Sequence, residues 1–261
     1  MKLGFIGTGA ITEAIVVGLM EAEYPLSEII VSARGAATAA RLAASFEKVR
    51  VCNHNQDIVD GSDLLFLAIR PQIAEEVISS LAFLRDRAIV SLIAMLPAEK
   101  IAEWIRHPVD VTRAISLPSV ANRFGVTEVY PACDRITQLF GALGTVVNAT
   151  SIEEFNSYGA AGSLMATYFG CLETAVQWMV DHGAEYGRAR TYVAQVFLGL
   201  AQTTIKSDAT FEALVGAHST PQGLNEQAYR VFAQSGGTDA LVAAMDSVAD
   251  SVATRTNSSF T

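Results

Sequence analysis

The sequence predicts an α/β protein in which an N-terminal domain with a mostly parallel sheet precedes an all-α domain. Two observations carry this prediction. Short β-branched runs alternate with helical stretches rich in Ala, Leu and Glu through about residue 150, and such alternation is typical of right-handed βαβ units. From Ser151 onward apolar residues instead recur at intervals of three and four, which is the period of a helix. The predicted domains are therefore residues 1–150 and 151–261.

The strands of the first domain are predicted at its short apolar runs, which are residues 2–6, 28–32, 63–69, 88–92 and 110–116. Two more strands, 126–130 and 145–147, flank an amphipathic stretch at 134–142. We expect these two to form the far edge of the same sheet.

The second domain is predicted to be helical over residues 155–186, 189–206, 208–217, 221–235 and 238–255. Its first stretch is rich in Gly, Ala, Met and aromatic residues and lacks a clear polar face. Such a helix must be buried, and about 110 residues of helix rarely supply enough core to bury it. We therefore expect an all-α dimerisation domain that interlocks with its copy in a homodimer or higher homo-oligomer. Burial against the chain's own first domain is the alternative.

Composition narrows the class of partner. The chain carries 18 Lys and Arg against 27 Asp and Glu, a formal net charge of -9. This charge repels nucleic acid and anionic membrane surfaces, so we expect neither as a partner and favour small-molecule chemistry. Three widely spaced cysteines argue against a disulfide framework and fit a cytoplasmic protein. The four histidines are scattered, so no metal site is expected.

The first predicted strand ends in a glycine turn, Gly7-Thr8-Gly9-Ala10-Ile11, and a helix is expected from Ala10 to Met20. Gly7 permits a tight turn, and Gly9 lets the backbone approach a pyrophosphate at the helix N-terminus. Thr12 stands where the motif has a third glycine. A glycine-rich turn can be only a turn, but its place between a strand and a helix predicts a dinucleotide-binding, Rossmann-type domain.

Residues after two further strands are candidates for the same cofactor site. The second strand ends in Ser32-Ala33-Arg34 rather than in the Asp or Glu that would bind a ribose 2′-hydroxyl, so NADP(H) is preferred over NAD(H). Arg34 can equally be a solvated loop residue. The apolar run 64–69 is followed by a turn expected to border the cofactor, with candidates Ala68, Ile69, Arg70 and Pro71. Alternatively, Pro71 merely starts a helix at 72–81.

A polar loop in the helical domain is the candidate substrate site. It reads His218-Ser219-Thr220-Pro221-Gln222-Gly223 and precedes a helical pattern that stops at Gly236-Gly237. Thr220 suits a helix N-cap, and Pro221 suits the first helical position. These preferences for a helix start can explain both residues without a functional role. A hydroxyl-rich helix N-terminus can also hold a small carboxylate through backbone donors. Both interpretations remain open from the residues alone.

The ordered motifs extend over most of the chain. They are Gly4-Phe5-Ile6-Gly7-Thr8-Gly9, Asp63 through Pro71, Arg113 leading residues 113–120, Asp181 with Gly183 and Gly187, and Ser219-Thr220-Pro221 with Gly223. Together they resemble the pyrroline-5-carboxylate reductase family, which reduces a cyclic imino acid to proline with NAD(P)H. The resemblance implies a Rossmann domain, a helical dimerisation domain, and an active site between one subunit's cofactor and a partner's helices.

The resemblance also implies roles for individual residues. Asn55 falls where the family touches the adenosine end of the cofactor. Pro221, Gln222 and Gly223 belong to the family's substrate loop, which binds the imino acid carboxylate. Ser219 and Thr220 are candidate catalytic hydroxyls. The family usually has a glycine at the position of Gln222 and a threonine pair at Leu224-Asn225, so Asn225 is the candidate replacement for the absent threonine.

Two more segments depart from the family. A Ser/Gly/Pro-rich start of the long dimerisation helix is replaced here by residues 162–171, and a Met-Pro-Asn segment by Ile115-Ser116-Leu117.

The expected function is NADPH-dependent reduction of a cyclic imine, with 1-pyrroline-5-carboxylate the first candidate. A protonated C=N bond is already electrophilic, so the reaction needs mainly a positioned hydride donor and exclusion of water. Alternatives are another cyclic ketimine as substrate, or a non-catalytic NADP(H)-binding sensor or scaffold. A β-hydroxyacid dehydrogenase-like enzyme is disfavoured, because residues 155–187 lack the lysine that such enzymes carry there.

Overall fold

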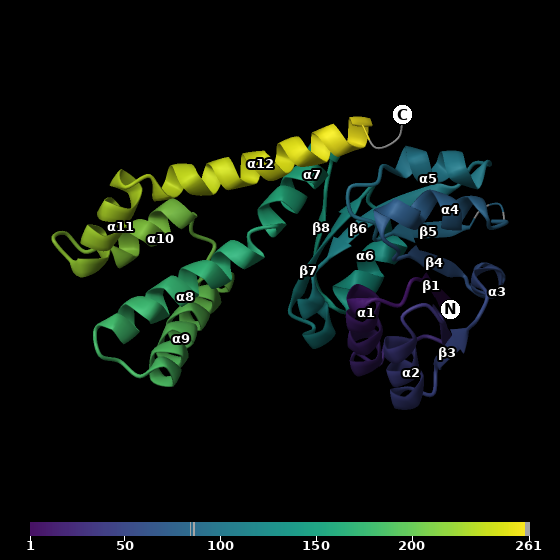
Figure 1. The fold of residues 1–261 in the computed structure, drawn as a ribbon, viewed down its shortest axis with the longest axis horizontal. Helices are drawn as coiled ribbons and strands as arrows, with labels where there is room; N and C mark the ends of the chain where they lie inside the picture. The colour runs from purple at the N-terminus through teal and green to yellow at the C-terminus, as the bar shows by residue number, and fades with distance from the viewer. Residues whose placement is uncertain (84, 86, 259–261) are drawn as a thin grey trace. The chain divides into compact units, whose positions relative to one another are not determined.

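The computed structural model describes residues 1–83, 85 and 87–258. The chain divides into two compact units, residues 1–159 together with the end of the chain from Ser251, and residues 160–250. The first unit contains a sheet flanked by helices, and the second consists of helices (Figure 1).

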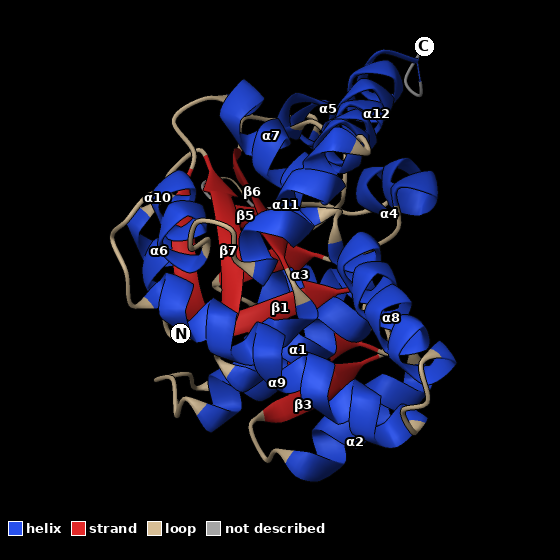
Figure 2. Cartoon of the chain, turned by 90° about the vertical axis from the view of Figure 1, so that its left-hand side faces the viewer, coloured by secondary structure: helices blue, strands red, loops and turns tan. Residues whose placement is uncertain are grey.

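Within the described residues the first unit holds one eight-stranded sheet, drawn in red in Figure 2. Its strands are β1 (Lys2–Ile6), β2 (Glu28–Ser32), β3 (Val49–Cys52), β4 (Leu64–Leu67), β5 (Ala88–Ser91), β6 (Asp110–Ser116), β7 (Gly125–Tyr130) and β8 (Gly144–Asn148). Their order is β3-β2-β1-β4-β5-β6-β7-β8, and only the β6–β7 pair is antiparallel. The predicted mostly parallel sheet, with β7 and β8 at its far edge, is confirmed.

Helices bury both faces of this sheet. α1 (Ala10–Glu21), α2 (Ala36–Ser45) and α6 (Asp134–Gly141) share one core with Phe5 and Phe66, whose rings stack with centroids 4.5 Å apart. α3 (Asn55–Gly61), α4 (Ala74–Ser79) and α5 (Ala98–Ile105) cover the other face, where Leu65 and Leu67 point. Burial on both sides explains why the β4 sequence is continuously apolar.

Several predicted boundaries differ from the structure. No strand was predicted at β3, which has four residues and carries the charged Arg50 in its middle. The strand predicted at 63–69 ends at Leu67. The helix predicted at 72–81 is instead a 3₁₀ turn at Pro71–Ile73 followed by α4, which ends at Ser79.

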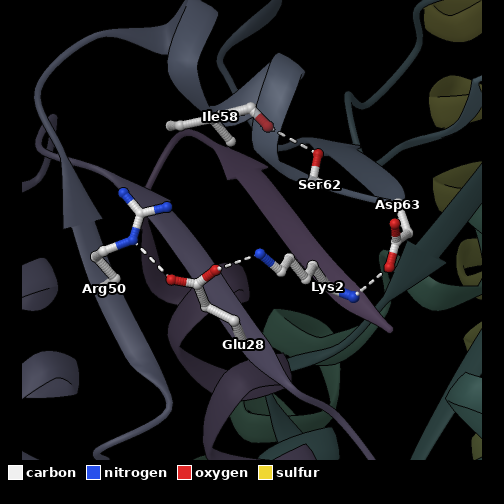
Figure 3. A network of polar contacts seen from close by, with 6 residues as sticks. All are labelled: Lys2, Glu28, Arg50, Ile58, Ser62 and Asp63. Atoms are coloured by element: carbon white, nitrogen blue, oxygen red, sulfur yellow. Dashed lines mark hydrogen bonds and ion pairs between the residues drawn. The ribbon is translucent and has the colours of Figure 1, made fainter.

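Ion pairs tie the amino ends of three strands together (Figure 3). The Glu28 carboxylate lies 2.7 Å from Nε of Arg50 and 3.4 Å from Nζ of Lys2. The backbone N–H of Lys2 donates to Asp63 over 2.7 Å. These charges neutralise one another at the edge of the sheet opposite to the one where ligands of such sheets bind.

The second unit contains four helices, α8 (Met165–Asp181), α9 (Tyr186–Ile205), α10 (Phe211–His218) and α11 (Leu224–Gln234), and most of α12 (Gly237–Ser258), while α7 (Ile152–Gly162) begins in the first unit. Its core among the described residues is small and centres on Val176, Ala189 and Val193. Large apolar side chains are exposed instead, with 65% of Phe169 and 62% of Trp178 accessible. No helix in the described part of the chain is long and apolar enough to cross a membrane.

The bounds of two predicted helices in this region are wrong. The stretch 155–186 is two helices, because the chain turns at Ser163 and Leu164 with bonds back to the carbonyls of residues 160 and 161. The helix predicted from 221 begins at Leu224, with Gly223 rather than Thr220 at its N-cap. Pro221 is therefore in a turn, since Gln222 adopts a φ of 62° that a helix does not allow.

Candidate functional site

The turn after β1 is shaped to receive a ligand. Gly7 has a φ of 101°, and a Cβ placed on it would lie 2.3 Å from the carbonyl oxygen of Ala68. Gly9 is the N-cap of α1, and a Cβ on it would meet no atom within 4 Å. No side chain caps α1, so the amides of Ala10 and Ile11 at its first turn face this open space. Free amides and the helix dipole at one open point suit a pyrophosphate.

Three hydroxyl groups hold this turn in place. The Ser32 hydroxyl accepts the N–H of Gly7 over 3.0 Å, and the buried Thr8 hydroxyl donates to the carbonyl of Ser32 over 2.6 Å. Thr12, fully buried at the position of the missing third glycine, donates to the carbonyl of Gly7 over 2.7 Å. Thr12 therefore supports the turn from inside, and Ser32 lies beneath it.

The turn after β2 rests directly on the glycine turn. Gly35 has a φ of 88°, and a Cβ there would lie 2.3 Å from the carbonyl oxygen of Thr8. Gly35 is also the N-cap of α2, again without a capping side chain, and Arg34 beside it is exposed. The sequence prediction named Arg34 but missed Gly35, because a single glycine between a strand and a helix is not distinctive until its contact with Thr8 is known.

The strand order brings the remaining candidates to the same edge. β1 lies between β2 and β4, which is where the order of an open α/β sheet reverses and where ligands bind. The carboxyl ends of these strands carry the glycine turn, Ser32 with Arg34, and residues 68–71. Asn55 starts α3 just after β3 and completes the edge. The backbone N–H of Ala68 donates to the carbonyl of Ile6 over 2.8 Å and so continues the pairing of β4 with β1. Arg70 is exposed.

The β5 end at this edge was not named from the sequence. Ser91 is buried, and its hydroxyl accepts the N–H of Ile93 over 3.3 Å. The chain then turns through Met95, whose φ is 60°. The signal in the sequence for a functional role of this segment was its position directly after the strand predicted at 88–92.

The loop after α10 lies in the second unit and is exposed. Ser219 is the C-cap of α10, and the N–H of Gly223 donates to the carbonyl of Thr220 over 2.8 Å. A Cβ on Gly223 would lie 2.3 Å from Oγ1 of Thr220. The turn therefore places the Thr220 hydroxyl against the N-cap of α11, which gathers the predicted hydroxyls and backbone donors in one loop.

Two side chains of α11 bond back to this loop. Asn225 donates from Nδ2 to the carbonyl of His218 over 3.0 Å. The Glu226 carboxylate accepts the N–H of Gln222 over 2.5 Å. Asn225 thus closes the loop, and Glu226 occupies one of the amides that a substrate carboxylate would use. Sequence reasoning did not single out Glu226, although an acidic residue in the first turn of a helix is a common cap.

Fold and site together define a class. A parallel sheet with an open, uncapped glycine turn at its switch point, followed by a helical unit, is the plan of a two-domain NAD(P)-dependent oxidoreductase. Among the described residues no group of three or more His, Cys, Asp or Glu side chains could hold a metal ion.

Comparison with known proteins specifies the class further. Residues 2–95 match the family described as NADP oxidoreductase coenzyme F420-dependent, and residues 156–254 match pyrroline-5-carboxylate reductase dimerisation. The pyrroline-5-carboxylate reductase of Pseudomonas aeruginosa is 27% identical over 254 residues, which cover 92% of this chain and 91% of that protein.

Two solved structures share the fold over nearly the whole chain. The 1-pyrroline-5-carboxylate reductase of Streptococcus pyogenes has a TM-score of 0.82 at 24% identity and covers 97% of this chain and 98% of its own. The Plasmodium falciparum pyrroline carboxylate reductase, with NADP bound, has a TM-score of 0.84 at 15% identity and covers 98% of each chain. The chain is therefore similar over most of its length to the pyrroline-5-carboxylate reductases, which are NAD(P)-dependent oxidoreductases acting on a CH–NH bond.

Proposed function

We propose that this protein reduces 1-pyrroline-5-carboxylate to L-proline with NADPH. The observation that carries the proposal is the open turn at Gly9, at the switch point of the sheet, in a chain whose helical region matches the dimerisation domain of this family. Both parts of the family's plan are present in the expected order.

The chain's own residues have simple tasks in this reaction. Bound NADPH would supply one hydride to the imine carbon, and the protonated imine nitrogen becomes the secondary amine of the product. Gly7 through Ile11 hold the pyrophosphate, while Asn55 and residues 68–71 border the rest of the cofactor. No strong acid or base is required, because the substrate nitrogen carries its proton before the transfer.

NADPH is the preferred donor in this proposal. Arg34 is exposed beside Gly35, the N-cap of α2, which has no capping side chain. A 2′-phosphate at this position would meet the guanidinium of Arg34 and the free amides of the helix N-terminus. Ser32 contributes by fixing the turn, since its hydroxyl already bonds to Gly7 and contacts the Thr8 hydroxyl.

The substrate loop binds the carboxylate through the backbone of Pro221, Gln222 and Gly223. Ser219 and Thr220 donate hydrogen bonds to it, and Asn225 keeps the loop closed through its bond to His218. Glu226 must release the Gln222 amide for the carboxylate to take it, because two carboxylates at one N–H repel each other.

A homodimer through the helical domain completes the proposal. The exposed aromatic side chains of α8 and α9, among them Phe169, Trp178 and Tyr192, support it, since monomers rarely expose large contiguous apolar surface. The predicted domains, 1–150 for the cofactor and 151–261 for dimerisation and substrate, remain part of it. We assign the protein to the cytoplasm, supported by the free thiols of Cys52, Cys133 and Cys171.

Nicotinamide absorbance tests the reaction directly. NADPH and NADH are each mixed with pyrroline-5-carboxylate and with imines of other ring size or carboxylate position. We expect the fastest oxidation with NADPH and pyrroline-5-carboxylate, and slower turnover by Thr220→Val and Gly223→Ala. Turnover unaltered in both variants would refute the role of the loop.

The occupied Gln222 amide favours one alternative, a protein that binds NADP(H) without reducing an imine. Glu226→Gln distinguishes the two cases. An active enzyme should show a lower KM for the carboxylate substrate in this variant, because the repelling charge is gone. Tight NADPH binding with no oxidation across the imine panel, in either protein, supports the non-catalytic alternative.

A further inference from the structure

A cavity lies away from the glycine turn, in the first unit. It has a volume of about 560 Å³ and is lined by α5, the start of β6, the end of β7 and the start of α7. Arg113 and Tyr130 face each other across β6 and β7 there. Because β6 runs parallel to β1, this is the amino-end side of the sheet, opposite to the edge that carries the glycine turn. The volume is in the range of small-molecule sites.

Arg113 lines this cavity, and its guanidinium has no hydrogen-bond partner among the residues that the structure describes. Only 6% of the residue is exposed. Among the described residues no hydrogen bond or ion pair to its five N–H donors is found, and the guanidinium carbon lies over the Phe155 ring, 4.6 Å from the ring centroid. Burial lowers the pKa of Arg113, an effect that the charges of Glu99 and Glu128 oppose. Its N–H donors are therefore free to bind an acceptor that enters the cavity.

Two acidic side chains lie at the exposed side of the same cavity. Glu99 on α5 and Asp110 at the start of β6 both line it, and both are exposed. A simple anion would be attracted by Arg113 at the floor but repelled by these two carboxylates on its way in. A cation would meet the opposite arrangement. A molecule with a negative end and a positive end fits both.

We propose that this cavity binds an amino acid, with its carboxylate on the guanidinium of Arg113 and its ammonium group toward Glu99 and Asp110. The carboxylate takes two parallel N–H donors of the guanidinium, the geometry for which arginine is suited. The ammonium group stays at the hydrated mouth. The site is independent of the reductase reaction, because none of its residues belongs to the glycine turn or to the 218–225 loop.

Thermal shift and calorimetry on the full-length protein test this proposal. Each proteinogenic amino acid is screened for a rise in Tm, and the strongest is titrated in a calorimeter beside propionate and ethylamine. We expect the amino acid to bind roughly ten- to a hundredfold more tightly than either half-molecule, since each supplies only one charge-assisted contact. No rise in Tm with any amino acid would refute the site, as would equal affinity for propionate.

Variants locate the binding. Glu99→Gln, on the exposed mouth, and Ala102→Phe, which fills the cavity from α5, should each weaken it about tenfold or more, with unchanged circular dichroism. Arg113→Lys should do the same by losing the paired donors. Glu75→Gln, an exposed carboxylate outside the cavity, is the matched control and should bind normally. Binding that survives Ala102→Phe but is lost in the Thr220→Val, Gly223→Ala double variant belongs to the substrate loop and overturns the proposal.

Discussion

Gly7 and Ala68 meet backbone against backbone, so closely that a Cβ on Gly7 would lie 2.3 Å from the Ala68 carbonyl oxygen. The φ of 101° at Gly7 adds strain for any other residue. We predict that Gly7→Ala lowers the free energy of unfolding by about 2–4 kcal/mol, from the positive φ and the backbone clash together. Chemical denaturation measures it. A variant as stable as the parent would show that β1 and β4 can separate freely at this point.

Gly9→Ala is the matched change two residues away. A Cβ there touches nothing within the protein, so we predict that the free energy of unfolding changes by less than about 1 kcal/mol. NADPH binding should weaken roughly tenfold or more, because the methyl group occupies the space that the pyrophosphate needs. Calorimetry with NADPH provides the measurement. Unchanged affinity in this variant would remove the turn from the cofactor site.

Arg34 should determine the choice between the two nicotinamide cofactors. We predict that Arg34→Ala raises the Kd for NADPH by roughly ten- to a hundredfold and leaves that for NADH nearly unchanged, since only NADPH has a 2′-phosphate to pair with it. Arg41→Ala, on α2 and already paired with Glu13 at 2.9 Å, is the control for lost positive charge. If the two variants weaken NADPH binding equally, the loss comes from the general reduction in positive charge and not from a specific contact of Arg34.

Gln222 has a φ of 62°, in the region that favours glycine. Gln222→Gly should keep or raise the free energy of unfolding, by up to about 1 kcal/mol, because relief of strain exceeds the entropy of the added glycine. Gln222→Val should lower it by about 1–2 kcal/mol, since a β-branched residue tolerates this φ poorly. Thermal denaturation of the pair tests the order, and equal stability of the two variants would contradict it.

The sequence predicted the mostly parallel sheet well, because strand runs such as β4 are local patterns. β3 was missed because four residues with a central Arg50 give little apolar pattern, and its pairing with β2 supplies what the pattern lacks. The role of Thr12 was also hidden. Its hydroxyl bond to Gly7 depends on the turn being folded.

The loop from His218 to Gly223 shows the same limit. Thr220 and Pro221 have the local preferences of a helix start, and the prediction followed them. The structure starts the helix at Leu224, because the left-handed Gln222 and the Glu226 bond to its N–H make a turn first. Backbone conformation at one residue overrode two local preferences, and the sequence carries no direct indication of it.

The buried Glu128 should make stability depend on pH. Only 8% of the residue is exposed, its Oε2 has no partner among the described residues, and burial raises its pKa to about 7 against the opposing charge of Arg113. Between its ordinary pKa of 4.5 and about 7, the folded state therefore binds more protons than the unfolded state. The free energy of unfolding must then fall as pH rises through this window. The total decrease in the free energy of unfolding across this window is up to about 3 kcal/mol.

Glu128→Gln isolates this contribution. The amide keeps the shape but does not ionise, so we predict that the variant loses this fall in stability between pH 4.5 and about 7 and is the more stable protein at pH 8, relative to the parent. Denaturant titrations of both proteins at pH 5 and pH 8 give the comparison. A difference between them that stays constant with pH would mean that Glu128 titrates normally in the folded chain, and that Arg113 or solvent holds its charge.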